Sequence, residues 1–131
     1  MNILGVDYGT KRIGLAWMQP GLDVVLPFGI IQTEEREEQL KDLVKLIQEE
    51  KIDVVVVGLP LELETGKETV NTKRVREFAM ELQKRCSVKV EFVDERLSSF
   101  EADQMGGEAS RDEKAAMVIL ETYAGNRADK T

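Results

Sequence analysis

The sequence predicts an α/β fold in which helices flank a mixed five-stranded sheet. Three observations predict it. Strand-like segments fill the first part of the chain, two further strands each follow a segment of helical periodicity, and the chain ends in helices. Its 131 residues are enough for one domain with a buried core, and we expect that single domain to span residues 1–131.

The first part of the chain predicts a meander of three strands. Residues 2–7 contain the apolar run ILGV, residues 11–18 alternate apolar side chains with others, and residues 24–32 follow a Pro-Gly turn. The short turn at residues 8–10 makes the first two strands a hairpin. We therefore expect the second strand to run antiparallel to the first.

Helices and strands alternate in the middle of the chain. Apolar residues recur at the spacing i, i+3, i+4, i+7 in residues 34–50 and again in residues 69–85, which predicts two amphipathic helices. Residues 53–57, DVVVV, form a β-branched run whose two faces should both be covered, as in a central parallel strand. Residues 88–93 predict the fifth strand.

The end of the chain predicts two more helices. A short one at about 98–105 precedes a Gly-Gly break at 106–107, and the last helix covers about 111–124. The complete order is therefore β-β-β-α-β-α-β-α-α. With right-handed crossovers, this is the order of a ribonuclease H-like fold.

Composition excludes several kinds of chemistry. The chain has no histidine, which rules out Ser-His-Asp triads, imidazole acid–base pairs and nearly every ordinary transition-metal site. The single cysteine, Cys86, gives neither an internal disulfide nor a zinc-binding cluster. A net charge of −7 argues against diffuse binding to nucleic acid but leaves room for local basic patches. Carboxylates, Lys, Arg, hydroxyls or a hard metal ion must carry any reaction.

Hydropathy gives no sign of a membrane protein. No segment approaches the about 18 consecutive apolar residues of a membrane span. The N-terminal segment has charges where a secretory signal needs an apolar run. We expect a soluble cytoplasmic protein with no membrane partner.

Acidic residues fall at comparable places in the predicted order. Asp7 ends the first strand, Asp94 and Glu95 follow the last strand, and Asp112 begins the last helix. Each also has a simpler explanation. Asp7 can form the hairpin turn, Asp112 can cap its helix, and Asp94 or Glu95 can pair with Arg96.

Acids that converge on one spot require a cation, because they repel one another and raise each other's pKa. Oxygen ligands without histidine or thiolate suit Mg²⁺ or Mn²⁺. Two such ions about 3.5–4 Å apart activate water and stabilise the leaving oxygen in phosphodiester hydrolysis. In this hypothesis Asp7 bridges the ions, Glu95 and Asp112 each hold one, and Asp94 is the alternative to Glu95.

Four motifs in order resemble the YqgF (RuvX) family: GVDYGTKRIGLA at 5–16, VVVVGLP at 54–60, DERLSS at 94–99 and D-x-x-A-A at 112–116. The resemblance implies a ribonuclease H-like fold, a divalent metal, nucleic-acid hydrolysis and an acidic triad at Asp7, Glu95 and Asp112. Members are described as Holliday junction resolvases or as nucleases that process the 5′ end of pre-16S ribosomal RNA. The resemblance favours RNA processing. A DNA junction resolvase, which needs a dimer, is the alternative, so monomer and homodimer both stay open.

Two segments depart from the family pattern. GGEAS and a lone Arg111 stand where relatives often have a longer loop rich in Lys and Arg. LELETG stands at 61–66 where relatives commonly carry Asn, Met and Asp. Phosphate contacts must then come from elsewhere, and the candidates are Lys11 and Arg12 on the hairpin, Lys73, Arg74 and Arg76 on the second helix, and Arg96 beside the acids.

Two other functional classes also fit the sequence. DYGTKRIG at 7–14 resembles the phosphate hairpin of actin-like and sugar-kinase ATPases, which share this sheet order but grip nucleotide between two such domains. The acidic surface and the short loop before Asp112 fit a non-catalytic interaction module. An ATP-binding module and an interaction module therefore remain alternatives to a nuclease.

Overall fold

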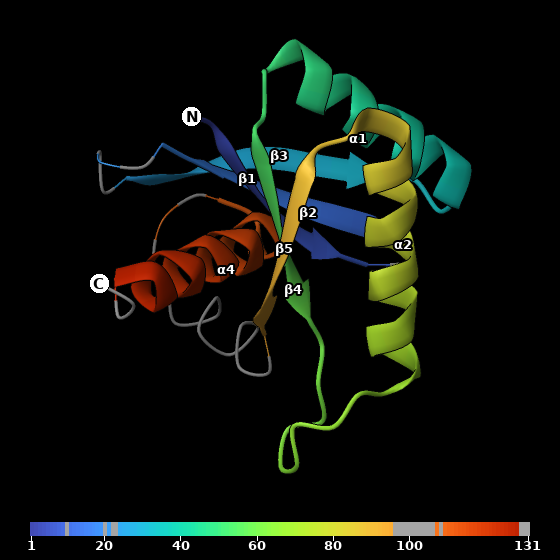
Figure 1. The fold of residues 1–131 in the computed structure, drawn as a ribbon, viewed down its shortest axis with the longest axis vertical. Helices are drawn as coiled ribbons and strands as arrows, with labels where there is room; N and C mark the ends of the chain where they lie inside the picture. The colour runs from blue at the N-terminus through green and yellow to red at the C-terminus, as the bar shows by residue number, and fades with distance from the viewer. Residues whose placement is uncertain (10, 20, 22–23, 96–106, 108, 129–131) are drawn as a thin grey trace.

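A mixed five-stranded sheet lies at the centre of the computed structural model, which describes residues 1–9, 11–19, 21, 24–95, 107 and 109–128 (Figure 1). Its spatial order is β3-β2-β1-β4-β5, with β2 antiparallel to β1 and β3 and with β1, β4 and β5 parallel. The predicted sheet is confirmed, and strand ends differ from expectation by no more than two residues. The strands are β1 (Ile3–Tyr8), β2 (Arg12–Met18), β3 (Val25–Gln32), β4 (Val54–Leu59) and β5 (Lys89–Asp94).

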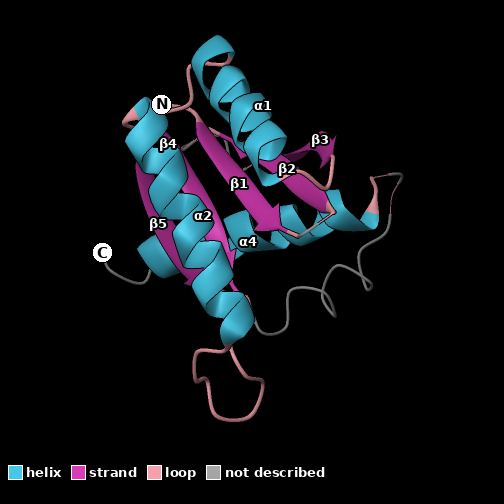
Figure 2. Cartoon of the chain, turned by 90° about the vertical axis from the view of Figure 1, so that its right-hand side faces the viewer, coloured by secondary structure: helices cyan, strands magenta, loops and turns pink. Residues whose placement is uncertain are grey.

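Helices cover both faces of the sheet (Figure 2). Helices α1 (Arg36–Glu49) and α2 (Val70–Cys86) pack on one face, and α4 (Arg111–Ala128) packs on the other. These three match the helices predicted at 34–50, 69–85 and 111–124, whereas the helix predicted at 98–105 lies outside the described residues. No helix in the described ranges is long and apolar enough to cross a membrane.

Strand alternation decides which side chains meet which helices. Successive side chains of a strand point to opposite faces. In β1, Leu4 and Val6 belong to the core cluster under α1 and α2, whereas Ile3 belongs to the cluster under α4. Asp7 continues the series of Ile3 and Gly5, so its side chain lies on the face that α4 covers.

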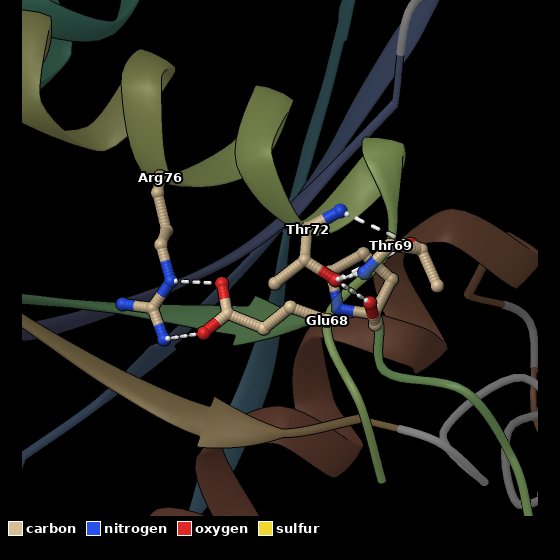
Figure 3. Close-up of polar contacts among 5 residues, drawn as sticks. Glu68, Thr69, Thr72 and Arg76 are labelled. Atoms are coloured by element: carbon tan, nitrogen blue, oxygen red, sulfur yellow. Dashed lines mark hydrogen bonds and ion pairs between the residues drawn. The ribbon is translucent and has the colours of Figure 1, made fainter. Parts of the chain in front are cut away.

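A threonine pair fastens the start of α2 to the end of β4 (Figure 3). The Thr69 side chain accepts a hydrogen bond from the Thr72 amide, and the Thr69 amide donates to Thr72 Oγ1 at 2.9 Å, which makes a capping box. The Thr72 hydroxyl donates in turn to the Pro60 carbonyl. Thr72 is fully buried, so these bonds fix the first turn of α2 against the strand end.

Substituting Thr72 with valine is expected to lower the free energy of unfolding by about 2 kcal/mol, because the Pro60 carbonyl and the Thr69 amide lose their buried partner. Urea denaturation measures the loss. Thr122→Val is the control, because the Thr122 hydroxyl only back-bonds to the Val118 carbonyl of its own helix, and it should cost less than about 0.5 kcal/mol. Equal losses in both variants would contradict the role given to the Thr72 bonds.

Candidate active site

Asp7 lies near the carboxyl end of β1, where two glycines flank it in the neighbouring strands. Gly14 of β2 is its direct register partner. Val6 pairs with Val57 in β4, and Gly58 follows Val57 in that strand just as Asp7 follows Val6 in β1. Because neither glycine has a side chain, the Asp112 backbone can approach the sheet at Gly14 and the Glu95 side chain can approach it at Gly58.

Glu95 reaches Asp7 from the end of β5. Its amide donates to the Leu59 carbonyl at 3.1 Å, which extends the β4–β5 pairing by one residue. An added Cβ on Gly58 would lie 2.5 Å from Glu95 Oε2, so this glycine leaves the room that the Glu95 side chain occupies. A side-chain hydrogen bond joins the carboxyl groups of Asp7 and Glu95.

The structure distinguishes Glu95 from Asp94. Val93 packs in the core cluster under α4, so the alternation along β5 turns Asp94 to the opposite face and Glu95 back toward α4. Asp94 is exposed, whereas the carboxyl group of Glu95 contacts that of Asp7. Of the two candidates for the middle acid, only Glu95 faces Asp7.

Asp112 enters from α4, on the other side of Asp7. The backbone of its first turn lies so close to β2 that a Cβ on Gly14 would overlap the Asp112 carbonyl. The Asp112 carboxylate pairs with Arg12, with 3.1 Å between Oδ2 and the guanidinium Nε. The two side chains are 28% and 57% exposed, so this ion pair lies at the rim of the site.

The environment of Asp7 disfavours its charge. Burial is the largest cause and raises the pKa of the carboxyl group above its ordinary value of 3.8. The hydrogen bond with Glu95 acts in the opposite direction, the Asp112 charge raises the pKa further, and the Arg111 charge lowers it. Asp7 therefore ionises less readily than a free aspartate, and a nearby cation would reverse that.

The donor atoms at this site are all carboxylate oxygens. Asp7 and Glu95 are in contact, and Asp112 is close enough for its charge to act on Asp7 while it is held by Arg12. In the described ranges, no three acidic or thiol side chains stand close enough together to hold one ion as they are placed. The donor chemistry fits a hard divalent cation, provided that Asp112 turns from Arg12 toward the other two acids.

Two hollows adjoin the Asp7–Glu95 carboxyl pair. One, of about 470 Å³, is here called the α4 hollow and is lined by residues that include Asp7, Arg12, Arg111 and Asp112. The other, of about 320 Å³, is called the α2 hollow and is lined by residues that include Tyr8, Asn71, Arg74 and Glu95. Because each hollow contains one member of the pair, the two acids mark the place where the hollows approach each other.

The family profile described as "RuvX: Holliday junction resolvase" matches residues 1–125, which is nearly the whole chain. The chain belongs to the RuvX family. Curated relatives agree. A protein of Maridesulfovibrio salexigens is 37% identical over 94% of this chain and 97% of its own length. One of Bordetella parapertussis is 41% identical over 93% and 92%. Both are described as "putative pre-16S rRNA nuclease".

Solved structures place the RuvX-family chain among ribonuclease H-like folds. Thermus thermophilus RuvC, solved in complex with a Holliday junction substrate, matches with a TM-score of 0.70 and 12% identity over 98% of this chain and 96% of its own. The fowlpox virus Holliday junction resolvase matches with a TM-score of 0.58 and 13% identity over 97% and 99%. The fold class predicted from the sequence is therefore confirmed.

Of the two cations predicted on the hairpin of this RuvX-family chain, Arg12 lies beside one of the three acids and Lys11 lies beside another carboxylate. Arg12 contacts Asp112, as described above, and Lys11 lies 4.0 Å from the Glu34 carboxylate, with both side chains largely exposed. Arg96, the cation predicted beside the acids, lies outside the described residues. Contacts of these cations with a phosphate backbone remain a prediction.

The cations predicted on α2 differ in how firmly they are held. Arg76 donates two hydrogen bonds to Glu68, at 2.8 and 3.2 Å (Figure 3). Its guanidinium also lies 5.3 Å from the centre of the Phe92 ring. The Arg76 guanidinium is therefore already engaged by side chains of the protein itself. Lys73 and Arg74 are exposed, and Arg74 lines the α2 hollow.

Glu113 is a positioning residue that the sequence analysis missed. Its Oε2 accepts from the Gly29 amide of β3 at 2.8 Å, and its Oε1 accepts from the amide and hydroxyl of Ser110. Ser110 Oγ accepts from the Glu113 amide, so the two residues form a capping box. The pattern S-x-x-E at 110–113 is the signal that could have revealed it. These bonds tie the start of α4, and with it Asp112, to the sheet.

Glu113→Gln is expected to lower stability at pH 7 by about 1 kcal/mol and to reduce activity, because one amide oxygen cannot accept from both Gly29 and Ser110. Burial raises the pKa of Glu113, but the bonds from Ser110 and Gly29 outweigh it and hold the pKa below 4.5. The stabilisation is therefore present above pH 4.5 and is lost as the pH falls through the folded pKa.

Denaturation curves of the Glu113→Gln variant and the parent protein should consequently converge in acid. Glu121→Gln is the matched control, because Glu121 is an exposed carboxylate on the same helix. It should change neither stability nor activity. An equal loss of stability in Glu113→Gln at pH 3 and pH 7 would contradict the stabilising role given to the ionised Glu113 carboxylate.

Proposed function

We propose that this chain is a metal-dependent nuclease that hydrolyses phosphodiester bonds in structured RNA and processes the 5′ end of pre-16S ribosomal RNA. The observation that carries the proposal is the Asp7–Glu95 carboxyl pair, held on the same sheet face as Asp112. The relatives described as pre-16S rRNA nucleases support the choice of substrate. Since ribosomes are assembled in the bacterial cytoplasm, the proposal includes a cytoplasmic location.

The metal ligands in this proposal are the three acids. Asp7, which bonds to Glu95 and interacts with the charge of Asp112, is assigned to two ions. Glu95 and Asp112 are assigned to one ion each. Mg²⁺ or Mn²⁺ would supply an activated water and charge stabilisation at the leaving oxygen. To take part, Asp112 gives up its ion pair with Arg12. Arg12 then becomes available to a substrate phosphate in the α4 hollow, beside Arg111.

A direct comparison of substrates tests the proposal. The purified protein is incubated with Mg²⁺ or Mn²⁺ and either an RNA that spans the mature 5′ end of 16S rRNA or a synthetic four-way DNA junction. We expect cleavage of the RNA at one position, and no cleavage in EDTA or by the Asp7→Asn variant. Preferential cutting of the junction would instead favour a resolvase.

The resolvase is the second candidate because the matching family profile carries that description. It predicts two symmetrical cuts and therefore a homodimer, whereas RNA cleavage is compatible with a monomer. If neither substrate is cut, calorimetry decides between the remaining classes. Micromolar binding of ATP with Mg²⁺ would favour an ATP-binding module, and the absence of any metal-induced stabilisation would favour an interaction module.

A further inference from the structure

The α2 hollow lies outside the three acids assigned to the reaction, yet it opens next to them. It lies where β1 and β4 end, beneath the first turns of α2, and Glu95 forms part of its wall. Its volume of about 320 Å³ is at the small end of the range for ligand sites. A group held there would therefore stand directly beside the Asp7–Glu95 carboxyl pair.

The charges of this hollow point to an anion on the α2 side. Among the described residues that line it, Arg74 is the one cation and Glu95 the one acid. No ion pair to a described carboxylate engages Arg74, whereas Arg76, two residues on, is bound to Glu68. The planar donor fork of arginine matches a phosphate group, and the Asn71 amide can add a further donor.

The wall that carries Arg74 is held rigidly. The Thr69–Thr72 capping box and the bond from Thr72 to the Pro60 carbonyl fasten the first turn of α2 to β4 (Figure 3). On the opposite side, the Tyr8 ring stacks on Phe78 of α2, with 4.2 Å between ring centroids. The position of the Arg74 backbone relative to the strand ends is thus fixed before any ligand arrives.

We infer that the α2 hollow binds the phosphodiester group next to the scissile one in the substrate strand, with Arg74 as its main contact and Asn71 as a second. This inference rests on the proposed function. A strand laid over the Asp7–Glu95 pair runs from the α4 hollow, with Arg12 and Arg111, into the α2 hollow. Among the described residues that line the α2 hollow, Glu95 would be the only charged one left without Arg74, and its carboxylate repels phosphate.

Binding measured without cleavage tests the inference. Anisotropy of a labelled RNA spanning the mature 5′ end is followed in Ca²⁺, which should support binding but not hydrolysis, over a series of salt concentrations. Arg74→Gln should raise the Kd several-fold and reduce the slope of log K against log salt by about 0.7, the value for one phosphate on a single strand. Lys84→Gln, an exposed cation ten residues further along α2, should leave both unchanged.

A single neutral methylphosphonate, moved along the RNA one linkage at a time, locates the contact. At one position it should weaken binding to the parent protein and to Lys84→Gln but not to Arg74→Gln, because that variant has already lost the interaction. The inference would be overturned if methylphosphonates weakened the binding of Arg74→Gln at the same positions and to the same extent as that of the parent protein. It would also be overturned if Arg74→Gln bound the unmodified RNA with the parental Kd.

The outcomes separate this inference from the proposed function. Cleavage of RNA with no dependence of binding on Arg74 overturns the inference and leaves the nuclease intact. Arg74-dependent binding without any cleavage in Mg²⁺ or Mn²⁺ supports the phosphate site and overturns the nuclease. Circular dichroism and thermal melting confirm that Arg74→Gln is folded, as expected for an exposed side chain.

Discussion

Asp7→Asn is expected to reduce RNA cleavage by at least about 10³-fold, because metal-ion stabilisation is worth several kcal/mol and each 1.36 kcal/mol is a factor of ten. The amide keeps the shape of the side chain and a hydrogen-bonding oxygen for Glu95 but removes the charge that two cations would share. Single-turnover cleavage with saturating enzyme measures the chemical step. Asp94→Asn, a neighbouring exposed acid on the opposite face, should keep most of the activity.

The same variant is expected to gain stability when no metal is present. Because the folded pKa of Asp7 lies above 3.8, its contribution to stability is full below that pH and is lost as the pH rises through the folded value. Asn does not ionise, so urea denaturation in EDTA should find Asp7→Asn more stable than the parent at pH 7, with the difference shrinking in acid.

Adding Mg²⁺ or Mn²⁺ should reverse that order. An ion that binds only the folded state stabilises it by mass action, and the parent protein offers one more carboxylate than the variant. The parent should therefore gain more stability from the metal than Asp7→Asn does. Equal gains in the two proteins would mean that Asp7 is not a ligand, whatever its effect on cleavage.

The sequence predicts that Asp7 ends the first strand and assigns the middle acid to Glu95, but it leaves Asp94 as the alternative. The apolar run identifies the first strand, and alternation along that strand puts Asp7 on the same face as Ile3. The choice between Asp94 and Glu95 needs the exact register of β5 on β4, because a shift of one residue exchanges their faces. In the structure, the hydrogen bond from the Glu95 amide to the Leu59 carbonyl belongs to that register. The local periodicity of the sequence does not reveal which residues of β4 and β5 pair.

Contacts between distant segments explain the remaining differences. Glu113 accepts from Gly29, 84 residues earlier, at a glycine beside the irregularity in the β2–β3 pairing. Nothing near Glu113 in the sequence identifies that partner. The sequence places Arg12 close to Asp7 but does not show that Arg12 forms an ion pair with Asp112. Helical spacing likewise groups Lys73 with Arg76, whereas the fold binds Arg76 to Glu68 and turns Arg74 to the hollow.

The glycines next to Asp7 belong to the site as much as the acids do, because they set how closely α4 approaches the sheet. A Cβ on Gly5 would lie 2.6 Å from Leu120 Cγ and 2.9 Å from the Ala116 carbonyl, and one on Gly14 would overlap the Asp112 carbonyl. Helix α4 therefore crosses the sheet over positions without side chains. The close approach at Gly5 sets the distance between α4 and the sheet, and the close approach at Gly14 sets the position of Asp112.

Gly14→Ala is accordingly expected to move the first turn of α4 away from β2, to cost about 1–3 kcal/mol of stability and to impair cleavage well beyond that loss, since Asp112 moves with the backbone. Thermal melting and cleavage at a temperature where the variant remains folded separate the two effects. Gly125→Ala is the control: nothing lies within 4 Å of the added methyl, and alanine in a helix should stabilise by about 0.5–1 kcal/mol. A Gly14→Ala variant with parental activity would mean that the acids tolerate a displaced α4, and that the close helix–sheet approach serves packing alone.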